Sequence, residues 1–223
     1  MTNVTGSRRN RKTVISPEEF NQMLKKTFEE QKRPNYPFYY GFRDRCILCI
    51  FRLTGKRVSE VARLEVSDVE IDDENLTITF TVSKKRKTQK LLLRRSKVIP
   101  LSNPLAKYIV EYVKWMRENF PEIKYLFPRT HFSPYYDTLS LDPDRHLTRQ
   151  QILRIIQKYN PNAWCHLFRE TVASDIIKKD ESIFAPWKVR RRLDLERVET
   201  ALRYLDRFAR DVIKETEVKE KIE

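Results

Sequence analysis

Residues 76–82 read Leu76-Thr77-Ile78-Thr79-Phe80-Thr81-Val82, and this alternation of apolar side chains with threonine decides the fold class. A period of two is typical of a strand that buries one of its faces. Residues 91–99 predict the return strand, so residues 83–90 form a strongly basic turn between the two. A β-hairpin is therefore expected over about residues 76–100.

The segments on both sides of the hairpin have helical periodicity. Ser16-Pro17-Glu18-Glu19 combines a capping box with a proline at the first helical position, which predicts the start of a helix. Two more helices are predicted before residue 65, and others begin at Asn103, at Thr148, at Cys165 and at about Glu196. Residues 120–147, rich in Pro, Tyr and Asp, predict a loop region. The expected fold class is mainly α with a small antiparallel β-sheet, an α+β arrangement.

The length of 223 residues suits a single domain with short appendages. Residues 1–15, which include Arg8 and Arg9, lack helical periodicity and predict a flexible basic arm. The domain itself is expected over residues 16–215, and residues 216–223 are expected to form a charged C-terminal tail.

The composition excludes several classes of protein. A surplus of 45 Lys and Arg over 31 Asp and Glu gives a net charge of +14, which favours a polyanionic partner. Only 3 glycines argue against a dinucleotide-binding fold or a P-loop, and 3 cysteines cannot build a disulfide framework. No apolar run approaches the roughly 20 residues of a membrane span. We expect a soluble, intracellular protein without a membrane segment.

Four short motifs follow one another along the chain, each on a definite type of predicted element. The first lies just after a buried helix, the second is the basic turn with the strand after it, and the last two lie on helices. They are Thr54-Gly55-Lys56-Arg57-Val58-Ser59-Glu60, then Lys84 to Lys90 followed by Val98-Ile99-Pro100-Leu101, then His166-Leu167-Phe168-Arg169-Glu170-Thr171-Val172-Ala173-Ser174, and finally Thr200-Ala201-Leu202-Arg203-Tyr204-Leu205.

This ordered set resembles the catalytic domain of the tyrosine recombinase (phage integrase) family, over about residues 40–206. The resemblance implies Arg57 and Arg169 as an arginine pair, His166 as their partner and Tyr204 as the nucleophile. It also implies that a lysine of the hairpin turn is the general acid. Lys87 is the preferred candidate because Lys-Thr-x-Lys is a common form in the family, and Lys85 and Lys90 are the alternatives.

The resemblance further implies site-specific cutting and rejoining of double-stranded DNA through a 3′-phosphotyrosyl intermediate, by a homo-tetramer, without metal or cofactor. It places the protein in the cytoplasm, associated with the nucleoid. Basic residues outside the catalytic set are expected to contact the DNA; they are Lys84, Lys85, Arg86 and Lys90 of the turn, Arg8 and Arg9 of the arm, and Arg191 and Arg192.

The chemistry of these residue types supports the same roles. Two guanidiniums carry permanent charge and bind phosphate oxygens bidentately, which suits the charge that develops during phosphodiester cleavage. A tyrosine hydroxyl attacks phosphorus once nearby positive charge or a base activates it. A lysine in a cationic cluster has a pKa lowered toward proton donation to the leaving sugar hydroxyl.

Two departures from the family pattern are visible. The family usually has His or Trp nine residues before the nucleophile, where this chain has Leu195, which cannot donate a hydrogen bond. Arg191, Arg192 and Trp187 are candidates to replace that donor. The family also usually carries a helical core-binding domain in front, which residues 1–40 are too short to form. A minimal recombinase or a catalytic-domain fragment is therefore expected.

Two alternative interpretations remain open on the sequence. One is a DNA-binding protein on the recombinase scaffold that no longer cuts. The other is an unrelated basic helical protein, for which Arg57, Arg169 and Tyr204 would lie far apart. Cys46 and Cys49 form a C-x-x-C inside an apolar helix, which favours core packing, and no metal site is predicted.

Overall fold

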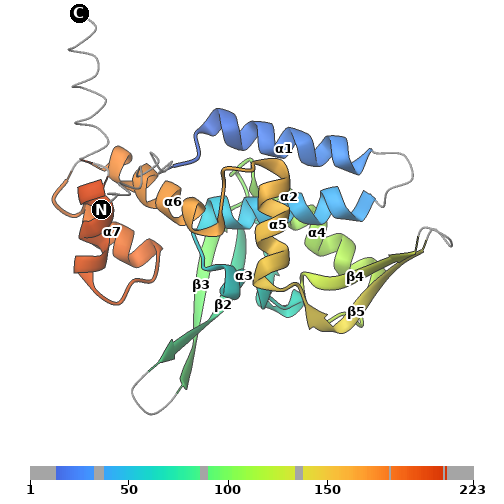
Figure 1. Cartoon of the computed structure of the whole chain (residues 1–223). Coiled ribbons are helices and arrows are strands. Elements are labelled where there is room, and N and C mark those ends of the chain that lie inside the picture. The colour runs from blue at the N-terminus through green and yellow to red at the C-terminus, as the bar shows by residue number, and fades with distance from the viewer. Residues whose placement is uncertain are drawn as a thin grey trace, which may run out of the picture.

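The structure is a computed structural model that describes residues 14–32, 38–85, 90–133, 138–180, 182–207 and 209. The side chains of residues 83–85, 90, 91, 132, 133 and 138 lie outside this description. Helices make up most of the described chain, together with two small antiparallel sheets (Figure 1). The predicted fold class is thereby confirmed.

A buried helix lies at the centre of the fold. This helix, α2 (Phe38–Thr54), packs against α1 (Pro17–Gln31), α4 (Ala106–Asn119) and α6 (Cys165–Lys179). It contributes a nearly continuous apolar run from Cys46 to Phe51, and every side chain of that run is fully buried. The core-packing prediction for Cys46 and Cys49 is confirmed, and burial raises the pKa of both thiols.

The helix starts follow local capping chemistry. Ser16 caps α1 as predicted: its Oγ accepts from the Glu19 amide at 3.2 Å, and Glu19 Oε2 accepts from the Ser16 amide at 2.9 Å. Thr148 caps α5 (Arg149–Tyr159) through the equivalent pair with Gln151. Capping residues in the sequence thus locate these two helix starts to the residue.

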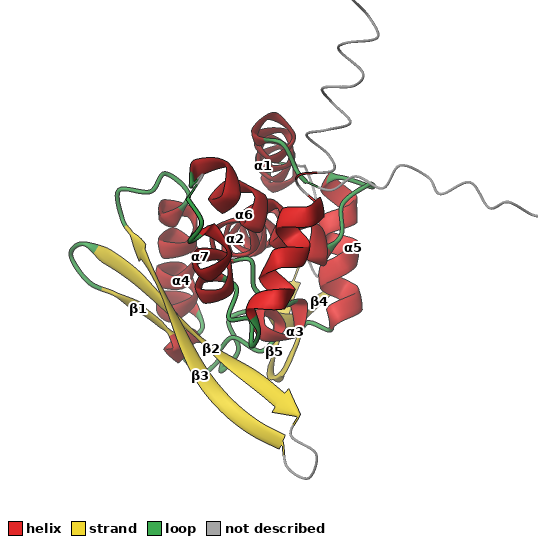
Figure 2. Cartoon of the chain, turned by 90° about the vertical axis from the view of Figure 1, so that its left-hand side faces the viewer, coloured by secondary structure: helices red, strands yellow, loops and turns green. Residues whose placement is uncertain are grey.

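The predicted hairpin is the longest β structure of the chain. Strand β2 (Asn75–Lys85) pairs with β3 (Lys90–Pro100), and the short β1 (Val69–Ile71) adds a third antiparallel strand beside β2. Its apolar face, with Ile78 and Phe80 fully buried, packs on the core. The far end of β2 and β3 extends away from the helices (Figure 2).

The remaining elements complete the described chain. A five-residue helix, α3 (Val58–Ala62), follows α2 and leads into the 3-10 turn Val66–Asp68. After α6, helix α7 (Ala185–Arg192) precedes a turn, and residues 198–207 form a last helix, here called the Tyr204 helix. Helices α6 and α7 gather at the end of the molecule opposite the β4–β5 hairpin (Pro128–Ser133 and Thr138–His146; Figure 1).

The structure corrects several details of the sequence prediction. Residues 120–147 are not all loop, because β4 and β5 pair antiparallel within them. Helix α7 was not predicted, since its arginines mask the buried face formed by Ala185, Pro186 and Val189. The basic arm does not extend to Ile15, which is buried and donates its amide to Thr171 Oγ1 at 2.9 Å. Helix α4 begins after Leu105, whose amide donates to Asn103 Oδ1.

Candidate active site

A pocket of about 700 Å³ lies where three helix starts meet. It is bounded by the beginnings of α3, α5 and α6, which are distant in the sequence. The structure brings three of the predicted residues, Arg57, His166 and Arg169, into the lining of this one pocket. The other lining residues are Lys56, Val58, Ser59, Thr148, Arg149, Gln150, Leu153, Trp164 and Cys165.

Arg169 is the fixed member of the arginine pair. Its side chain is buried in α6, with Nη1 donating to the Gly55 carbonyl at 2.7 Å and Nη2 to the Leu193 carbonyl at 2.5 Å. Burial, and next the charge of Arg57, lower the pKa of Arg169, while Tyr204 opposes this change. Because the ordinary pKa of arginine lies far above neutral pH, the guanidinium stays charged despite this lowering. Two backbone carbonyls therefore hold a permanent positive charge at the wall of the pocket.

Arg57 is the more accessible member of the pair. It occupies the N-cap position of α3, and its side chain is 51% exposed. The buried Glu60 binds both the backbone and the side chain of Arg57. Glu60 Oε2 accepts from the Arg57 amide and Glu60 Oε1 accepts from Arg57 Nη1, each at 3.1 Å. This geometry leaves the remaining guanidinium donors of Arg57 available to a ligand in the pocket.

His166 lies one helical turn before Arg169 on α6. Burial lowers its pKa below the ordinary value, and the nearby charges of Arg169, Arg207 and Arg57 lower it further. Its Nε2 lies 3.7 Å from Glu170 Oε1. A neutral imidazole beside two arginines can donate one hydrogen bond without adding a third full charge.

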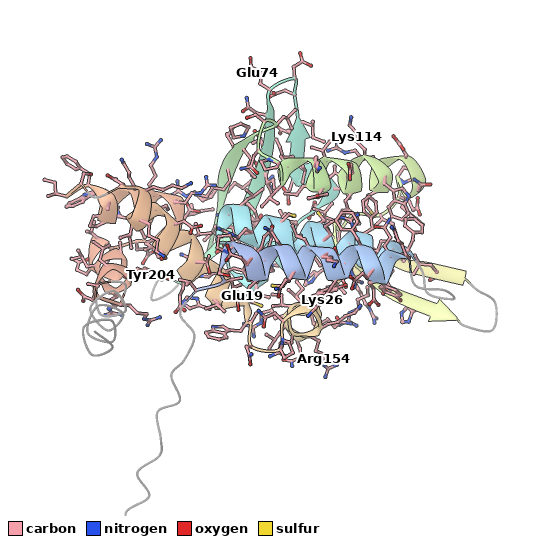
Figure 3. All side chains as sticks on the ribbon, turned by 90° about the horizontal axis from the view of Figure 1, so that it is seen from above. Glu19, Lys26, Glu74, Lys114, Arg154 and Tyr204 are labelled. Carbon is pink, nitrogen blue, oxygen red and sulfur yellow. The ribbon has the colours of Figure 1, made fainter. Side chains whose placement is uncertain are left out.

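Tyr204 reaches this site from the last helix of the described chain. Tyr204 lies close enough to Arg169 to oppose the lowering of the pKa of that guanidinium. One turn further on, Arg207 pairs with the buried Glu170 of α6, so an ion pair attaches the Tyr204 helix to α6. Figure 3 shows Tyr204 at the α6–α7 end of the molecule. The interpretation in which Arg57, Arg169 and Tyr204 lie far apart is wrong.

Leu195, at the position where a hydrogen-bond donor was expected, has an apolar role instead. It is buried in a second small core with Val172, Val189 and Ala201, on which Tyr204 also packs. Of the proposed replacements, Arg192 donates to the Leu53 carbonyl at 2.5 Å, whereas Arg191 and Trp187 line a separate groove of about 550 Å³. None of the three lines the pocket of Arg57 and Arg169.

The predicted site residues of the hairpin turn and of the arm lie largely outside the described part of the structure. Arg8, Arg9, Arg86 and Lys87 lie outside the described residues. Lys84, Lys85 and Lys90 belong to the paired ends of β2 and β3, but their side chains are not described. The assignment of the general acid to Lys87, Lys85 or Lys90 therefore stays a prediction.

Sequence reasoning missed three charged residues at and behind the pocket wall, of which Lys56 lines the pocket. Lys56 and Lys97 are both buried, and both donate to the carboxylate of Asp194 in the turn after α7. The alternation of β3 contained a signal for Lys97, because it shares the inward face with Ile99. Within the described part of the chain, no cluster of three or more His, Cys, Asp or Glu could hold a metal ion.

A family model described as the phage integrase family matches residues 13–210. The chain belongs to the phage integrase family. This match covers most of the chain and includes Arg57, His166, Arg169 and Tyr204.

Relatives of this integrase-family chain agree with that assignment. A tyrosine recombinase XerD from Staphylococcus haemolyticus is 27% identical over 180 residues, which cover 77% of this chain and 51% of the relative. The chain thus spans about half the length of the curated relative that it matches.

Solved structures show the same fold at lower identity. The XerA recombinase has a TM-score of 0.61 at 16% identity, covering 93% of this chain and 64% of that one. The XerH site-specific recombinase bound to a palindromic difH substrate, a post-cleavage complex, has a TM-score of 0.60 at 18% identity, covering 93% and 53%. In the described regions of this integrase-family chain, no helix has the length and apolar character to cross a membrane.

Proposed function

We propose that the chain cuts and rejoins DNA as a site-specific recombinase through a 3′-phosphotyrosyl intermediate. The observation that carries the proposal is the convergence of Arg57, His166 and Arg169 on one pocket, with Tyr204 near enough to Arg169 to influence its pKa. A pocket lined by two guanidiniums and a neutral imidazole fits a phosphodiester, and Tyr204, which lies near Arg169, is the proposed nucleophile.

The proposed reaction assigns one task to each side chain. Tyr204 Oη attacks the scissile phosphorus and gives up its proton to water as the new P–O bond forms, and the bond between phosphorus and the 5′-oxygen breaks. Arg57 and Arg169 bind the non-bridging oxygens and stabilise the charge that grows on them in the transition state. His166 donates a further hydrogen bond. A hairpin lysine, Lys87 by preference, protonates the leaving 5′-oxygen.

The energy of the broken bond is conserved in this sequence of steps. The phosphotyrosine replaces one phosphodiester linkage by another, so a 5′-hydroxyl of a partner strand can attack it and release Tyr204 unchanged. The reaction therefore needs neither ATP nor an external nucleophile, and the proposed substrate is double-stranded DNA.

The proposed partner arrangement is a homo-tetramer on two DNA sites. Two of the XerH structures that share this fold are described as bound to difH substrate, before and after cleavage. The net charge of +14 supports a DNA partner for this chain as well. We propose that the exposed Arg191 and the basic hairpin turn follow the DNA backbone, and that the basic residues of the arm do the same.

A second candidate function is favoured by Leu195. This buried side chain offers no hydrogen bond to a phosphate, so the site has one donor fewer than the family pattern. A DNA-binding protein on the recombinase scaffold that no longer cuts would have this composition. It would bind duplex DNA in a salt-dependent manner and form no covalent complex.

A covalent-trapping experiment distinguishes the two functions. The chain is incubated with a pool of nicked duplexes whose sequence around the nick is randomised, so that cleavage releases a short fragment and traps the protein on the DNA. An adduct that resists SDS is expected with the wild type, and sequencing of the trapped DNA gives the target site.

Tyr204→Phe is the critical variant, and Tyr125→Phe is its matched control. Tyr125 contacts His146 and does not line the pocket, so its variant is expected to form the adduct at the wild-type level. Tyr204→Phe is expected to bind DNA and form none. The catalytic proposal is refuted by a wild type that binds duplex DNA without any adduct, and the assignment of Tyr204 by an adduct that survives Tyr204→Phe.

A further inference from the structure

The turn between α7 and the Tyr204 helix contains a carboxylate held by two lysines. Lys56 Nζ lies 2.6 Å from Asp194 Oδ2, and Lys97 Nζ lies 3.0 Å from Asp194 Oδ1. The three residues come from separate parts of the chain, namely the segment before α3, strand β3 and the turn itself. Asp194 therefore connects three elements that are distant in the sequence.

Both lysines are buried, which makes their partner indispensable to the local charge balance. The Lys56 side chain is 1% exposed and that of Lys97 is 8% exposed, against 18% for Asp194. Lys56 Nζ also lies 4.6 Å from the centre of the Phe80 ring. Two cations in such a place repel each other strongly because buried charges are poorly screened, and a negative charge between them offsets this repulsion.

The same turn is attached to the arginine pair. The Leu193 carbonyl accepts from Arg169, and Lys97 also donates to the Arg191 carbonyl at 3.2 Å. Lys56 immediately precedes Arg57 in the chain. A displacement of Asp194 would thus be transmitted to Arg169 through Leu193 and to Arg57 through Lys56.

The backbone conformation of Asp194 is one that non-glycine residues rarely adopt. Its φ is +49°, and it is the only non-glycine residue with a positive φ in the described part of the chain. Residues held in the left-handed region cost free energy unless the surroundings compensate, and aspartate and asparagine tolerate it best among non-glycine residues. The two lysine contacts supply that compensation.

We propose that Asp194 is a positioning residue that fixes the Tyr204 helix relative to Arg57 and Arg169. Held between Lys56 and Lys97, it sets the point from which residues 195–204 depart, and hence the approach of Tyr204 Oη to the phosphate. This inference rests on the proposed recombinase function. Asp194 itself does not line the pocket and touches no reacting atom.

Asp194→Asn tests the inference with little disturbance of shape, because asparagine keeps both the size and the tolerance of a positive φ. The rate of covalent adduct formation is measured in a single turnover on a duplex recovered from the randomised pool. We expect a decrease on the order of tenfold to a hundredfold, as misplacement of a nucleophile by an ångström produces. The dissociation constant for the same duplex is expected to stay within about twofold, since no phosphate contact is removed.

Asp175→Asn is the matched control. Asp175 also joins two elements by an ion pair, with Arg52 Nη1 at 2.5 Å, but it lies outside the pocket of Arg57 and Arg169. Its variant is expected to lose stability without a change in adduct rate. If the two variants reduce the rate equally at equal loss of stability, Asp194 is a structural residue only and the inference is overturned.

A substrate with sulfur at the 5′-bridging position separates nucleophile placement from proton donation. A thiolate leaves without protonation, so this substrate restores the rate of a variant whose general acid is disturbed. We expect the defect of Asp194→Asn to persist on it, because the approach of Tyr204 is what has changed. Full recovery on the sulfur substrate would assign the effect to the hairpin and overturn the inference.

A double variant tests whether the three charges act as one unit. Asp194→Asn combined with Lys97→Met removes one of the two repelling lysines, and we expect it to be no slower than Asp194→Asn alone. Independent effects that multiply would contradict the inference. A wild type that forms no adduct refutes the proposed function instead, so the two failures are distinguishable.

Discussion

At the residue scale, the two arginines of the pocket have the same charge but different structural tasks. Arg169 is buried and bonded to two backbone carbonyls, whereas Arg57 is half-exposed and bonded to one carboxylate. The first is therefore part of the core as well as of the site. Substitution by lysine should separate these tasks, because lysine keeps the charge but loses the planar fork.

We expect Arg169→Lys to lose both activity and stability. The free energy of unfolding should fall by about 1–3 kcal/mol, since the carbonyls of Gly55 and Leu193 lose their donors. Arg57→Lys should reduce the adduct rate on the order of a hundredfold or more with a change in stability below about 0.5 kcal/mol. Urea denaturation and single-turnover trapping measure the two quantities, and equal destabilisation by both variants would contradict this division.

The pKa of His166 predicts a pH dependence of stability. Because burial and the neighbouring arginines lower this pKa, the folded protein resists a proton that the unfolded chain accepts below about pH 6.5. The free energy of unfolding should therefore decrease as the pH falls from about 6.5 toward the folded-state pKa, with no contribution above that window. In His166→Gln this part of the decrease should vanish. Urea titrations of both proteins at pH values across the window measure it, and parallel curves would refute the prediction.

At the element scale, the Tyr204 helix is attached to the molecule by a few contacts rather than by a continuous core. Leu195 and Ala201 pack on Val172 and Val189, and Arg207 pairs with Glu170. A helix attached this way can be displaced without unfolding the rest, because the main core around α2 does not depend on it.

Leu195→Ala tests how the Tyr204 helix is attached. We expect a loss of about 2–3 kcal/mol in stability, from the reduced burial and the space left behind. The adduct rate should fall as the helix loosens, while the affinity for duplex DNA changes little. Calorimetry and trapping on the same protein preparation test this, with Leu202→Ala as the control because that side chain of the Tyr204 helix is exposed. Equal effects of the two substitutions would be inconsistent with the role of Leu195.

The elements also show what the sequence could predict and why the rest escaped it. The β2–β3 hairpin follows from the alternation Leu76 to Val82, and the starts of α1 and α5 follow from the capping boxes at Ser16 and Thr148, since both signals are local. Strands β4 and β5 were missed because their composition is that of a loop and their pairing is decided by contacts with each other.

The candidate site divides in the same way. Arg57, His166, Arg169 and Tyr204 were predicted from motifs whose order indicates the family. Asp194, Lys56 and Lys97 were not, because their importance arises only when three distant segments meet. The role of Leu195 as an apolar anchor likewise depends on α7, a helix that the sequence did not predict.

At the scale of the whole molecule, the positive charge is expected to act where DNA lies and not elsewhere. The free end of the β2–β3 hairpin points away from α4, the helix that carries the exposed Lys107 and Lys114 (Figure 1), and α4 contributes no residue to the pocket lining. Neutralising two basic residues on either surface changes the net charge by the same amount. A comparison of the two variants therefore separates the effect of position from the effect of net charge.

Salt dependence of DNA binding measures this difference. Lys84→Gln with Arg86→Gln should reduce the slope of log K against log salt by about 0.9 for each DNA phosphate that the protein no longer neutralises. Lys107→Gln with Lys114→Gln should leave the slope near that of the wild type. Fluorescence anisotropy of a labelled duplex at several salt concentrations gives both slopes, and an equal decrease in both would mean that only net charge matters.

The tryptophan that lines the pocket has a practical consequence. Trp164 borders the space between α3, α5 and α6, whereas Trp187 is exposed on α7 and Trp115 lies in an aromatic cluster with Tyr39, Phe42 and Tyr112. A nucleotide stacked near Trp164 would quench its emission and leave that of Trp115 unchanged. In a Trp187→Phe protein, the chain thus carries its own optical sensor of site occupancy, readable in a stopped-flow instrument without any attached dye.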